Sequence, residues 1–274
     1  MRVPRHVVEE RRQRLAGLLE RHTYLPVSEL CRILGVSEAT ARRDLSELER
    51  QNKIKRTHGG AFAEFNDRFP SFNQRQTRGS EAKQVIARLA LEWIQPGGIY
   101  FLDSGTTIYC LAEAFRRNPR AGVRFVTSNL PAGEMLAAVP DVEVFQVAGQ
   151  ILSRQSVLLG EAACRSLEFW NFDTAFVSAE AANEKGIFNT QQAIVQQQLV
   201  AIRRSARTAF CLDSGKIGRS APFPLVPWSD VDILITDASP ARLEKAGVPK
   251  DKIAPPPATA PAEDSRPQLP VHFL

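Results

Sequence analysis

Residues 99–235 repeat one pattern that restricts the fold more than any other feature of the chain. Short apolar runs alternate with segments of helical period, and each run stops at small polar or acidic residues. This alternation is typical of an α/β domain with a mainly parallel sheet, because each parallel connection needs a crossover, usually a helix. The expected strands are 99–102, 123–126, 142–148, 174–177, 208–212 and 231–235.

The residues that follow these runs are candidates for a ligand site. In open parallel sheets ligands bind beyond the carboxyl ends of the strands, so the six ends are expected to line one crevice. The first end carries Asp103-Ser104-Gly105-Thr106-Thr107, and the triplet Asp-Ser-Gly recurs at 213–215. Because the same polar triplet follows two strands, it favours a ligand-binding role over a plain turn between strand and helix.

The chemistry of these strand ends suits a phosphorylated sugar. Gly105 lets the main chain approach a ligand, and the two threonines after it would open a helix whose free amides favour an anion. Lys216 adds a charge suited to phosphate, and Asp103 and Glu180 can accept hydrogen bonds from sugar hydroxyls. A plain strand-to-helix turn with a threonine cap is the alternative for Gly-Thr-Thr alone. No Walker A, GxGxxG or GxSxG sequence occurs, so nucleotide hydrolysis and serine-hydrolase chemistry lack support.

The first 60 residues carry the whole net charge of +5, with 13 Lys and Arg against 8 Asp and Glu. Apolar periodicity predicts helices over 6–21, 27–34 and 38–51. The last two are joined by Gly35-Val36, which is the pattern of a helix-turn-helix. A basic small domain before a neutral large one suggests contact with a polyanion, although an ordinary solvated surface gives the same total.

The third of these helices has the composition of a helix that enters the DNA major groove. Ser37 is expected to cap it. Its outward side holds Ala39, Thr40 and Arg43, with Arg42 on the flank. Small or hydroxyl residues followed by arginines suit a groove, since arginine reads guanine or clamps phosphate. An amphipathic helix with a solvated face is the alternative, but the turn, the cap and the charge together favour DNA.

A short hairpin is expected over 53–62, KIKRTHGGAF, as the wing of a winged helix. Lys55 and Arg56 would reach backbone phosphate, which gives affinity without sequence reading. His58 lies in the turn of this DNA-binding segment, where a local hydrogen bond is its plainest role. The sequence therefore predicts a winged helix-turn-helix that binds double-stranded DNA.

Several sequence blocks resemble one protein family. Residues 25–61, with the blocks VSEATARRDL and RTHGGA, resemble the N-terminal domain of the DeoR family of bacterial transcriptional regulators. The blocks LDSGTT, VTSN, LLGEAA and LDSGKIGRSA resemble the C-terminal sensor domain of the same family. The resemblance spans about residues 8–237.

The resemblance implies a C-terminal domain similar in fold to ribose-5-phosphate isomerase and glucosamine-6-phosphate deaminase, which senses a phosphorylated sugar or a related metabolite. Arg75 and Lys83 also fit the family pattern. The chain departs from it at Gln150, at 178–181 and at two glutamines in 191–198, Gln192 and Gln196, which leaves the sugar open. Together the residues and the resemblance give the candidate effector site Asp103, Ser104, Gly105, Thr106, Thr107, Ser128, Asn129, Glu180 and Lys216.

Composition, periodicity and the positions of Pro and Gly divide the chain into four expected segments. These are a winged helix-turn-helix over 1–62, a linker over 63–79, the α/β domain over 80–253 and a disordered Pro-rich tail over 254–274. Ser80 is expected to cap a helix over 81–94. The four cysteines lie far apart, with no CxxC and no histidine at metal-ligand spacing, so no metal or cofactor is expected.

Three functional hypotheses follow. The first is a cytoplasmic DNA-binding regulator, a repressor of carbohydrate-metabolism genes controlled by a phosphorylated sugar and acting as a homo-oligomer, because paired winged helices read paired half-sites. The second is a sugar-phosphate isomerase or deaminase with an appended DNA-binding domain, which would use Asp103, Glu180 and Asp213 as proton carriers. The third is a DNA-binding protein whose altered pocket binds nothing. A membrane protein is not expected, since no apolar run approaches the roughly 20 residues of a span.

Overall fold

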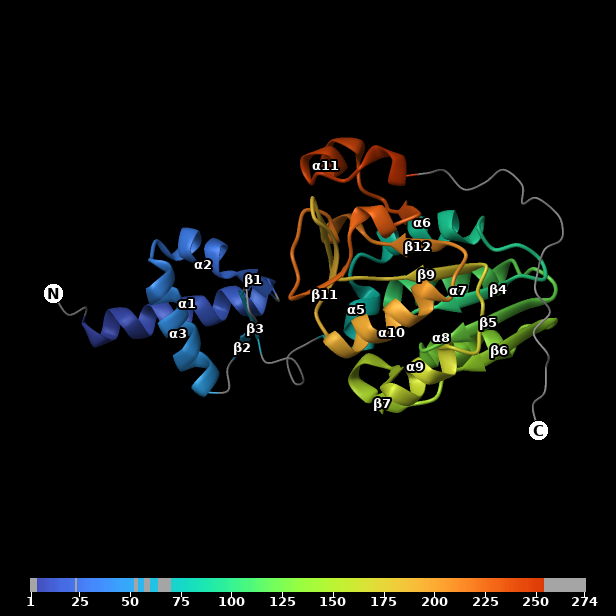
Figure 1. Cartoon of the computed structure of the whole chain (residues 1–274), viewed down its shortest axis with the longest axis horizontal. Coiled ribbons are helices and arrows are strands. Elements are labelled where there is room, and N and C mark those ends of the chain that lie inside the picture. Colours follow the sequence, from blue (N-terminus) through green and yellow to red (C-terminus); the bar gives the residue numbers. More distant parts are fainter. Residues whose placement is uncertain (1–3, 23, 52–53, 57–59, 64–69, 254–274) are drawn as a thin grey trace.

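The computed structural model describes residues 4–22, 24–51, 54–56, 60–63 and 70–253. Figure 1 shows a small, mostly helical part at the N-terminal end and a larger part built around a sheet. Among the described residues no helix is long and apolar enough to cross a membrane. The tail at 254–274 lies outside the described residues.

The N-terminal part is a three-helix winged domain. Its helices are α1 (Arg5–His22), α2 (Val27–Leu34) and α3 (Glu38–Arg50). The segment β1 (Tyr24–Pro26) joins β2 (Ile54–Arg56) and β3 (Gly60–Ala63) in an antiparallel sheet of order β1-β3-β2. The expected hairpin therefore has a third strand, since β1, which the sequence did not reveal, pairs with β3.

Packing of the helix-turn-helix depends on one left-handed residue. Gly35 follows α2 with φ +64°, a conformation that a residue with a side chain seldom adopts. The turn lets α2 and α3 pack on α1 around a buried core. That core is made of Leu15, Leu18, Leu19, Leu25, Val27, Leu30, Ala41, Leu45, Leu48 and Ile54.

The larger part contains a six-stranded, fully parallel sheet of order β14-β12-β9-β4-β5-β6. Its strands are β4 (Ile99–Leu102), β5 (Val123–Thr127), β6 (Val142–Gln146), β9 (Thr174–Val177), β12 (Thr208–Cys211) and β14 (Ile233–Ile235). The expected α/β class is confirmed, and the six strands are those expected. β6 ends two residues before its expected end, and β14 begins two residues after its expected start.

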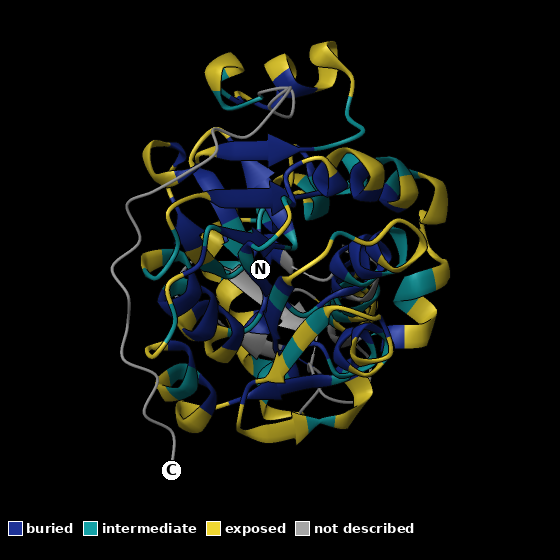
Figure 2. Cartoon of the chain, turned by 90° about the vertical axis from the view of Figure 1, so that its right-hand side faces the viewer, coloured by how far each residue is buried: buried dark blue, intermediate teal, exposed yellow. Residues whose placement is uncertain are grey.

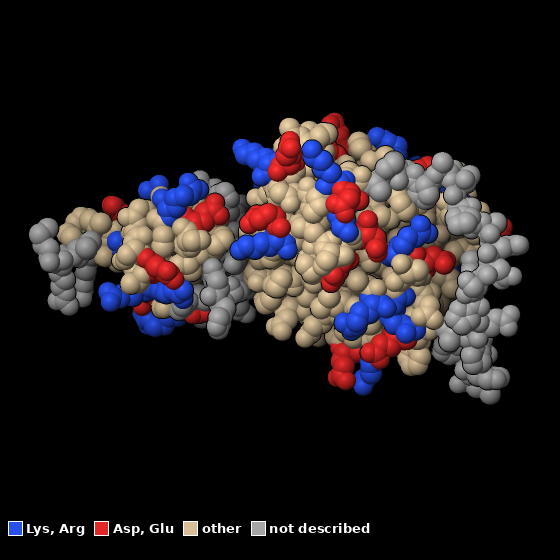
Figure 3. All heavy atoms as spheres, turned by 45° about the horizontal axis from the view of Figure 1, so that its top comes forward, with Lys and Arg blue, Asp and Glu red and all other residues tan. Residues whose placement is uncertain are grey.

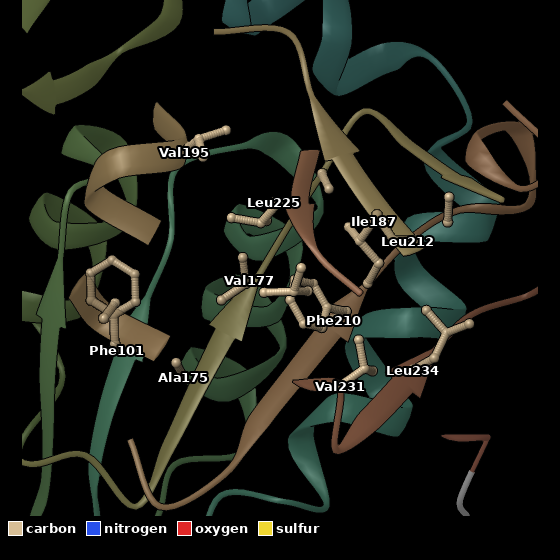
Figure 4. Close-up of a cluster of buried hydrophobic side chains, with 14 of the residues drawn as sticks. Phe101, Ala175, Val177, Ile187, Val195, Phe210, Leu212, Leu225, Val231 and Leu234 are labelled. Carbon is tan, nitrogen blue, oxygen red and sulfur yellow. The ribbon is translucent and has the colours of Figure 1, made fainter. Parts of the chain in front are cut away.

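Helices cover both faces of this sheet, because successive strand residues point to opposite sides. Tyr100 and Leu102 pack into a cluster with α6 (Ser80–Leu91), α7 (Thr106–Arg117) and α8 (Leu130–Ala137). Phe101 packs on the other face with α9 (Glu161–Leu167) and α10 (Gln192–Arg203). Figure 4 shows this second cluster, and Figure 2 shows buried strands between helices with exposed outer surfaces.

Smaller elements extend the sheet domain. A three-stranded antiparallel sheet is formed by β10 (Ala181–Asn183), β11 (Gly186–Asn189) and β13 (Phe223–Val226). A hairpin is formed by β7 (Gln150–Leu152) and β8 (Val157–Leu159). Short helices are α5 (Phe72–Thr77), η1 (Ser153–Gln155), η2 (Ser214–Lys216), η3 (Trp228–Asp230), α11 (Pro240–Lys245) and η4 (Lys250–Lys252).

The segment expected as a linker, 63–79, is partly a helix. Ser71 and Gln74 form a capping box that starts α5, and the Phe72 ring packs edge-to-face on Tyr109 of α7 at 5.4 Å between centroids. The expectation that Ser80 caps the next helix is wrong, since α6 begins at Ser80 itself, after Gly79, and ends at Leu91. The described end of the linker therefore packs against the sheet domain.

Candidate functional site

A cleft of about 320 Å³ lies beyond the carboxyl ends of β4, β9 and β12. Its walls come from five places: the α5–α6 segment, the start of α7, the residues after β9, the residue after β11 and the loop after β12. The residues at these places are Pro70, Arg75, Arg78, Gly79, Lys83, Gly105, Thr106, Thr107, Ser178, Ala179, Glu180, Thr190, Asp213, Gly215, Lys216, Arg219, Ser220 and Ala221. The ends of β5, β6 and β14 do not line it, so three of the six expected strand ends meet here.

The start of α7 gives the cleft one wall of main-chain amides. Gly105 has φ +123°, and a Cβ at this position would lie 2.6 Å from the Ser178 Oγ, so a glycine is required. Thr106 and Thr107 are the first helical residues, and no acidic residue lies in the first turn. A 12-residue helix with its amino end at a cleft favours an anion there.

The charges that line the cleft are mainly positive. Five basic side chains and two acidic ones contribute to its walls. The sequence predicted Lys216 here and left Arg75 and Lys83 open. It missed Arg78, which lies in a segment without a recognisable motif, and Arg219, which lies in the block LDSGKIGRSA but was not singled out there. This excess of positive charge favours an anion in the cleft.

Lys83 holds the α5 segment against the sheet domain. Its ammonium group donates to the main-chain oxygens of Arg75 and Arg78, the latter at 2.6 Å. The side chain is almost fully buried, and burial lowers its pKa, while Asp213 opposes this shift. Because Lys83 also lines the cleft, one charged group contacts both the cleft and the segment leading to the N-terminal domain.

Lys216 forms an ion pair with Glu180 across the cleft wall. Burial alone would raise the pKa of Glu180, but Lys216, Arg75 and Lys83 outweigh burial and lower it. The loop before the lysine is held by Asp237, whose carboxylate accepts from the Ser214 amide at 2.6 Å and from its hydroxyl at 2.9 Å. Asp237 was expected at the crevice and instead supports the loop.

Asp103 lies beside the cleft rather than on its wall. It lines a pocket of about 20 Å³ together with Ser104, and this pocket shares Arg75, Ser178 and Glu180 with the cleft. Its carboxylate accepts from the Ser178 amide and hydroxyl, both at 3.0 Å, and from Gln198 Nε2 at 2.8 Å. Burial raises the pKa of Asp103 to about 6, although these donors act in the opposite direction.

Ser128 and Asn129 lie behind the cleft and line neither pocket. Asn129 is fully buried, accepts from the Ala132 amide at 3.2 Å as the cap of α8, and donates to the Gly105 oxygen at 3.1 Å. The Asn129 side chain thus holds the turn at Gly105, from which the α7 wall of the cleft begins. Ser128 is buried too, and its hydroxyl has no hydrogen-bond partner among the described residues.

The glutamines at which the sequence departs from the family pattern lie on the surface, away from the cleft. Gln192 and Gln196 are exposed on α10, and Gln150 is exposed on β7. Gln198, two residues beyond Gln196 on α10, is the glutamine that reaches the site, where it contacts Asp103 and Asn189. Sequence reasoning missed it because the run 191–198 holds five glutamines, at 191, 192, 196, 197 and 198, which differ only in the face of the helix they occupy.

The candidate DNA-binding residues of α3 share one exposed face. Ser37 caps the helix by accepting from the Thr40 amide at 3.3 Å. Ala39, Arg42 and Arg43 are exposed, and Arg42 is paired with Glu38 at 2.6 Å. Figure 3 shows Lys and Arg gathered along two edges of the small part.

A buried aspartate, which the sequence did not single out, fixes the direction of α3. Asp44 is 2% exposed and accepts from Arg11 at 2.6 Å and from Arg12 at 3.0 Å. These residues are 33 and 32 positions apart, so only the fold brings them together. In the wing, Lys55 and Arg56 lie on β2, and His58 falls outside the described residues.

Comparison with known proteins gives matches to both parts of the chain. Residues 11–67 match the DeoR-like helix-turn-helix domain, and residues 78–238 match the DeoR C terminal sensor domain. The chain is 30% identical to the HTH-type transcriptional regulator GlpR of Haloferax volcanii, over 87% of this chain and 95% of that protein. It is 29% identical to the glycerol-3-phosphate regulon repressor of Escherichia coli, over 84% of this chain and 91% of that protein.

Among solved structures, ribose 5 phosphate isomerase A from Neisseria gonorrhoeae is similar over 51% of this chain and 54% of that chain. The sequence identity is 18% and the TM-score is 0.38.

Proposed function

Because this chain belongs to the DeoR family of transcriptional regulators, we propose that it represses carbohydrate-metabolism genes and that a phosphorylated sugar in the cleft controls it. The glycerol-3-phosphate regulon repressor of Escherichia coli, 29% identical, is a relative whose name points to such a ligand. The observation that carries the proposal is the cleft itself, which combines five basic side chains with the amino end of α7.

Each wall of the cleft has a role in this proposal. The amides of Thr106 and Thr107, with Lys216, bind the phosphoryl group, and Arg75 adds charge. The pocket beside Asp103 has a volume of about 20 Å³, which suits a single hydroxyl or water. A small phosphorylated polyol or sugar fits a site with one anionic and one hydroxyl position.

On the DNA side, the exposed face of α3 enters the major groove and Lys55 and Arg56 bind backbone phosphate. Ser37, Ala39 and Thr40 stand at the amino end of α3, where base edges are usually read. One winged helix reads a short site, so we propose that the regulator acts in the cytoplasm as a homo-oligomer on paired half-sites.

We further propose that the cleft senses its ligand and does not convert it. Proton transfer between carbons needs a carboxylate that faces the substrate. Asp103 accepts three hydrogen bonds from Ser178 and Gln198, and Glu180 is paired with Lys216, so both are engaged. An isomerase or deaminase would first have to break these contacts, so that one of the two carboxylates could face the substrate.

The test is binding of the purified protein to DNA from upstream of its own gene, measured by fluorescence anisotropy. The panel contains glycerol 3-phosphate, pentose and hexose phosphates, and each unphosphorylated counterpart. We expect one phosphorylated compound to change the DNA affinity while its unphosphorylated form does not. Tight DNA binding that no compound alters would contradict the proposed effector. Conversion of any compound by the protein would favour the enzyme instead.

A further inference from the structure

Lys216, the lysine best placed to bind a phosphoryl group, already has an anionic partner within the chain. Its ammonium group donates to the Glu180 carboxylate, and the two side chains are 25% and 21% exposed. Both residues line the cleft. A ligand that approaches from solvent therefore meets a lysine whose charge is already balanced.

The main chain holds these two residues side by side. Ala182 forms a parallel bridge with Ile217, and its oxygen accepts from the Gly218 amide at 2.8 Å. Ala182 and Ile217 are buried, and Asp237 fixes the start of the same loop. The backbone positions of the pair are therefore set by the fold, while the side chains remain at the edge of solvent.

We propose that Glu180 is an internal competitor for Lys216, which occupies the lysine until a phosphoryl group displaces its carboxylate. The proposal rests on the proposed function of the cleft as a phosphorylated-sugar site. A phosphate monoester carries a charge of about −1.5 to −2 near pH 7, against −1 for a carboxylate, so the exchange favours the ligand. Arg75 and Lys83, which already act on Glu180 electrostatically, favour the incoming anion for the same reason.

The consequence is a weaker site than the same cleft without Glu180. Every anion that uses Lys216 must first break the internal pair, so its apparent dissociation constant rises by one constant factor. A partly exposed ion pair makes this factor about fivefold. Glu180 thus raises the effector concentration at which the regulator responds.

The alternative is that Glu180 only repels anions through its field. Competition and repulsion differ in how Glu180 depends on Lys216. If the carboxylate acts by occupying the lysine, removing it gains nothing once the lysine is absent. If it acts through space, the gain persists in both backgrounds, and a double-mutant cycle separates the two.

The experiment uses the full-length protein as wild type, Glu180→Gln, Lys216→Met and the double variant. Inorganic phosphate and glycerol 3-phosphate are the probes, at pH 7.5 and constant ionic strength. The dissociation constants come from the rise in denaturation midpoint with ligand concentration. The matched control is Glu184→Gln, an exposed glutamate outside the cleft with the same change of charge.

We expect Glu180→Gln to bind phosphate about fivefold more tightly, in keeping with one partly exposed pair, and Glu184→Gln to match the wild type. We expect Lys216→Met to weaken phosphate binding, and the double variant to bind phosphate no more tightly than Lys216→Met alone. Glu180→Asp, a methylene shorter, keeps the charge and gives an intermediate gain, which provides a second test if the glutamine variant does not fold.

Two results would overturn the inference. One is an unchanged affinity in Glu180→Gln, and the other is the same gain with and without Lys216. Either leaves the proposed function standing as long as the wild type binds phosphate or glycerol 3-phosphate. If neither the wild type nor any variant binds these probes or any other phosphorylated sugar, the proposed function itself fails.

Discussion

Asp103 and Glu180 are neighbouring carboxylates whose pKa values are shifted in opposite directions. Burial opposes ionisation of both, but only Glu180 has a lysine as a partner. Asp103 accepts from the neutral donors of Ser178 and Gln198, which do not compensate the loss of water, and its pKa is raised to about 6. A charge partner therefore decides the sign of a pKa shift at this site more than depth of burial does.

The raised pKa of Asp103 makes the stability of the sensor domain depend on pH. The folded state binds this proton more tightly than the unfolded chain, whose ordinary value is 3.8. The free energy of unfolding therefore falls as the pH rises from about 4 to about 6, by on the order of 3 kcal/mol, and is constant above. Urea denaturation of wild type and Asp103→Asn from pH 4 to 7.5 measures it. A pH-independent difference between them would contradict the assignment.

At the DNA surface, Arg43 is the residue expected to read sequence. It is exposed on the outward face of α3, whereas its neighbour Arg42 is paired with Glu38 at 2.6 Å. Arg43→Ala should weaken operator binding by about 1–3 kcal/mol and binding to random DNA much less, because a bidentate contact to guanine is lost. Anisotropy with both DNAs measures the two losses. Equal losses would show that Arg43 contacts only phosphate.

At the scale of elements, we propose that α5 couples the ligand to the DNA-binding domain, because it lines the cleft and follows that domain in the chain. Phe72 anchors it on α7 through Tyr109, and Lys83 of α6 holds the main chain at Arg75 and Arg78. The same segment lines the cleft. An anion that attracts the Lys83 ammonium would compete with the carbonyl oxygens of Arg75 and Arg78. We propose that ligand binding acts on the α5 segment in this way.

Replacing Lys83 by methionine should loosen α5 without unfolding the sheet domain. The two carbonyl oxygens lose their donor, while the methionine keeps most of the side-chain volume. We expect amide hydrogen exchange in 72–79 to become about tenfold faster and the effector to lose its influence on DNA. Arg88→Met, exposed on the same helix, is the matched control. Unchanged exchange in α5 would remove Lys83 from this role.

The sequence predicted whole elements better than it predicted contacts. The helix α2 was found because its apolar stripe ends at the turn Gly35-Val36, and the six strands were found because each ends in polar residues. The helix α5 was missed because six residues are too few to show a period. The Asp44–Arg11 and Glu180–Lys216 pairs were missed because they join residues 33 and 36 positions apart.

The same limit explains the placement of the candidate site. Gly105, Thr106, Thr107, Glu180 and Lys216 come together in the cleft, since each is close to a strand end. Ser128 and Asn129 follow a strand in the same way but turn inward, because Asn129 is needed to hold the Gly105 oxygen. Periodicity places a residue at an edge of a sheet and does not say what its side chain contacts there.

At the scale of the whole molecule, charge is divided between the two parts. The first 60 residues hold the net +5, and the rest of the chain is neutral. Affinity for any DNA is thus expected to come from the N-terminal part, through counterion release at phosphate. We expect sequence specificity to come from α3 and control of DNA binding to come from the cleft.

Removing the wing charges tests this division. The double variant Lys55→Ala, Arg56→Ala should lower affinity for all DNA sequences alike and reduce the slope of log affinity against log salt by about 2. Anisotropy titrations between 50 and 200 mM salt, roughly the range over which phosphate contacts are resolved, provide the slope. Arg32→Ala, an exposed arginine of α2, serves as the comparison. An unchanged slope would place the wing outside the DNA interface.

The capping box at Ser71 has a consequence for anyone who wishes to transplant this sensor onto another output domain. The helix that it starts, α5, contributes to a wall of the cleft, and a hydrogen bond from Lys83 holds it against the sheet domain. A fusion joined at Ser80 would discard Arg75, Arg78 and the two carbonyl groups that Lys83 holds. The portable unit therefore begins at Pro70, so that it keeps the residues of this segment that line the cleft.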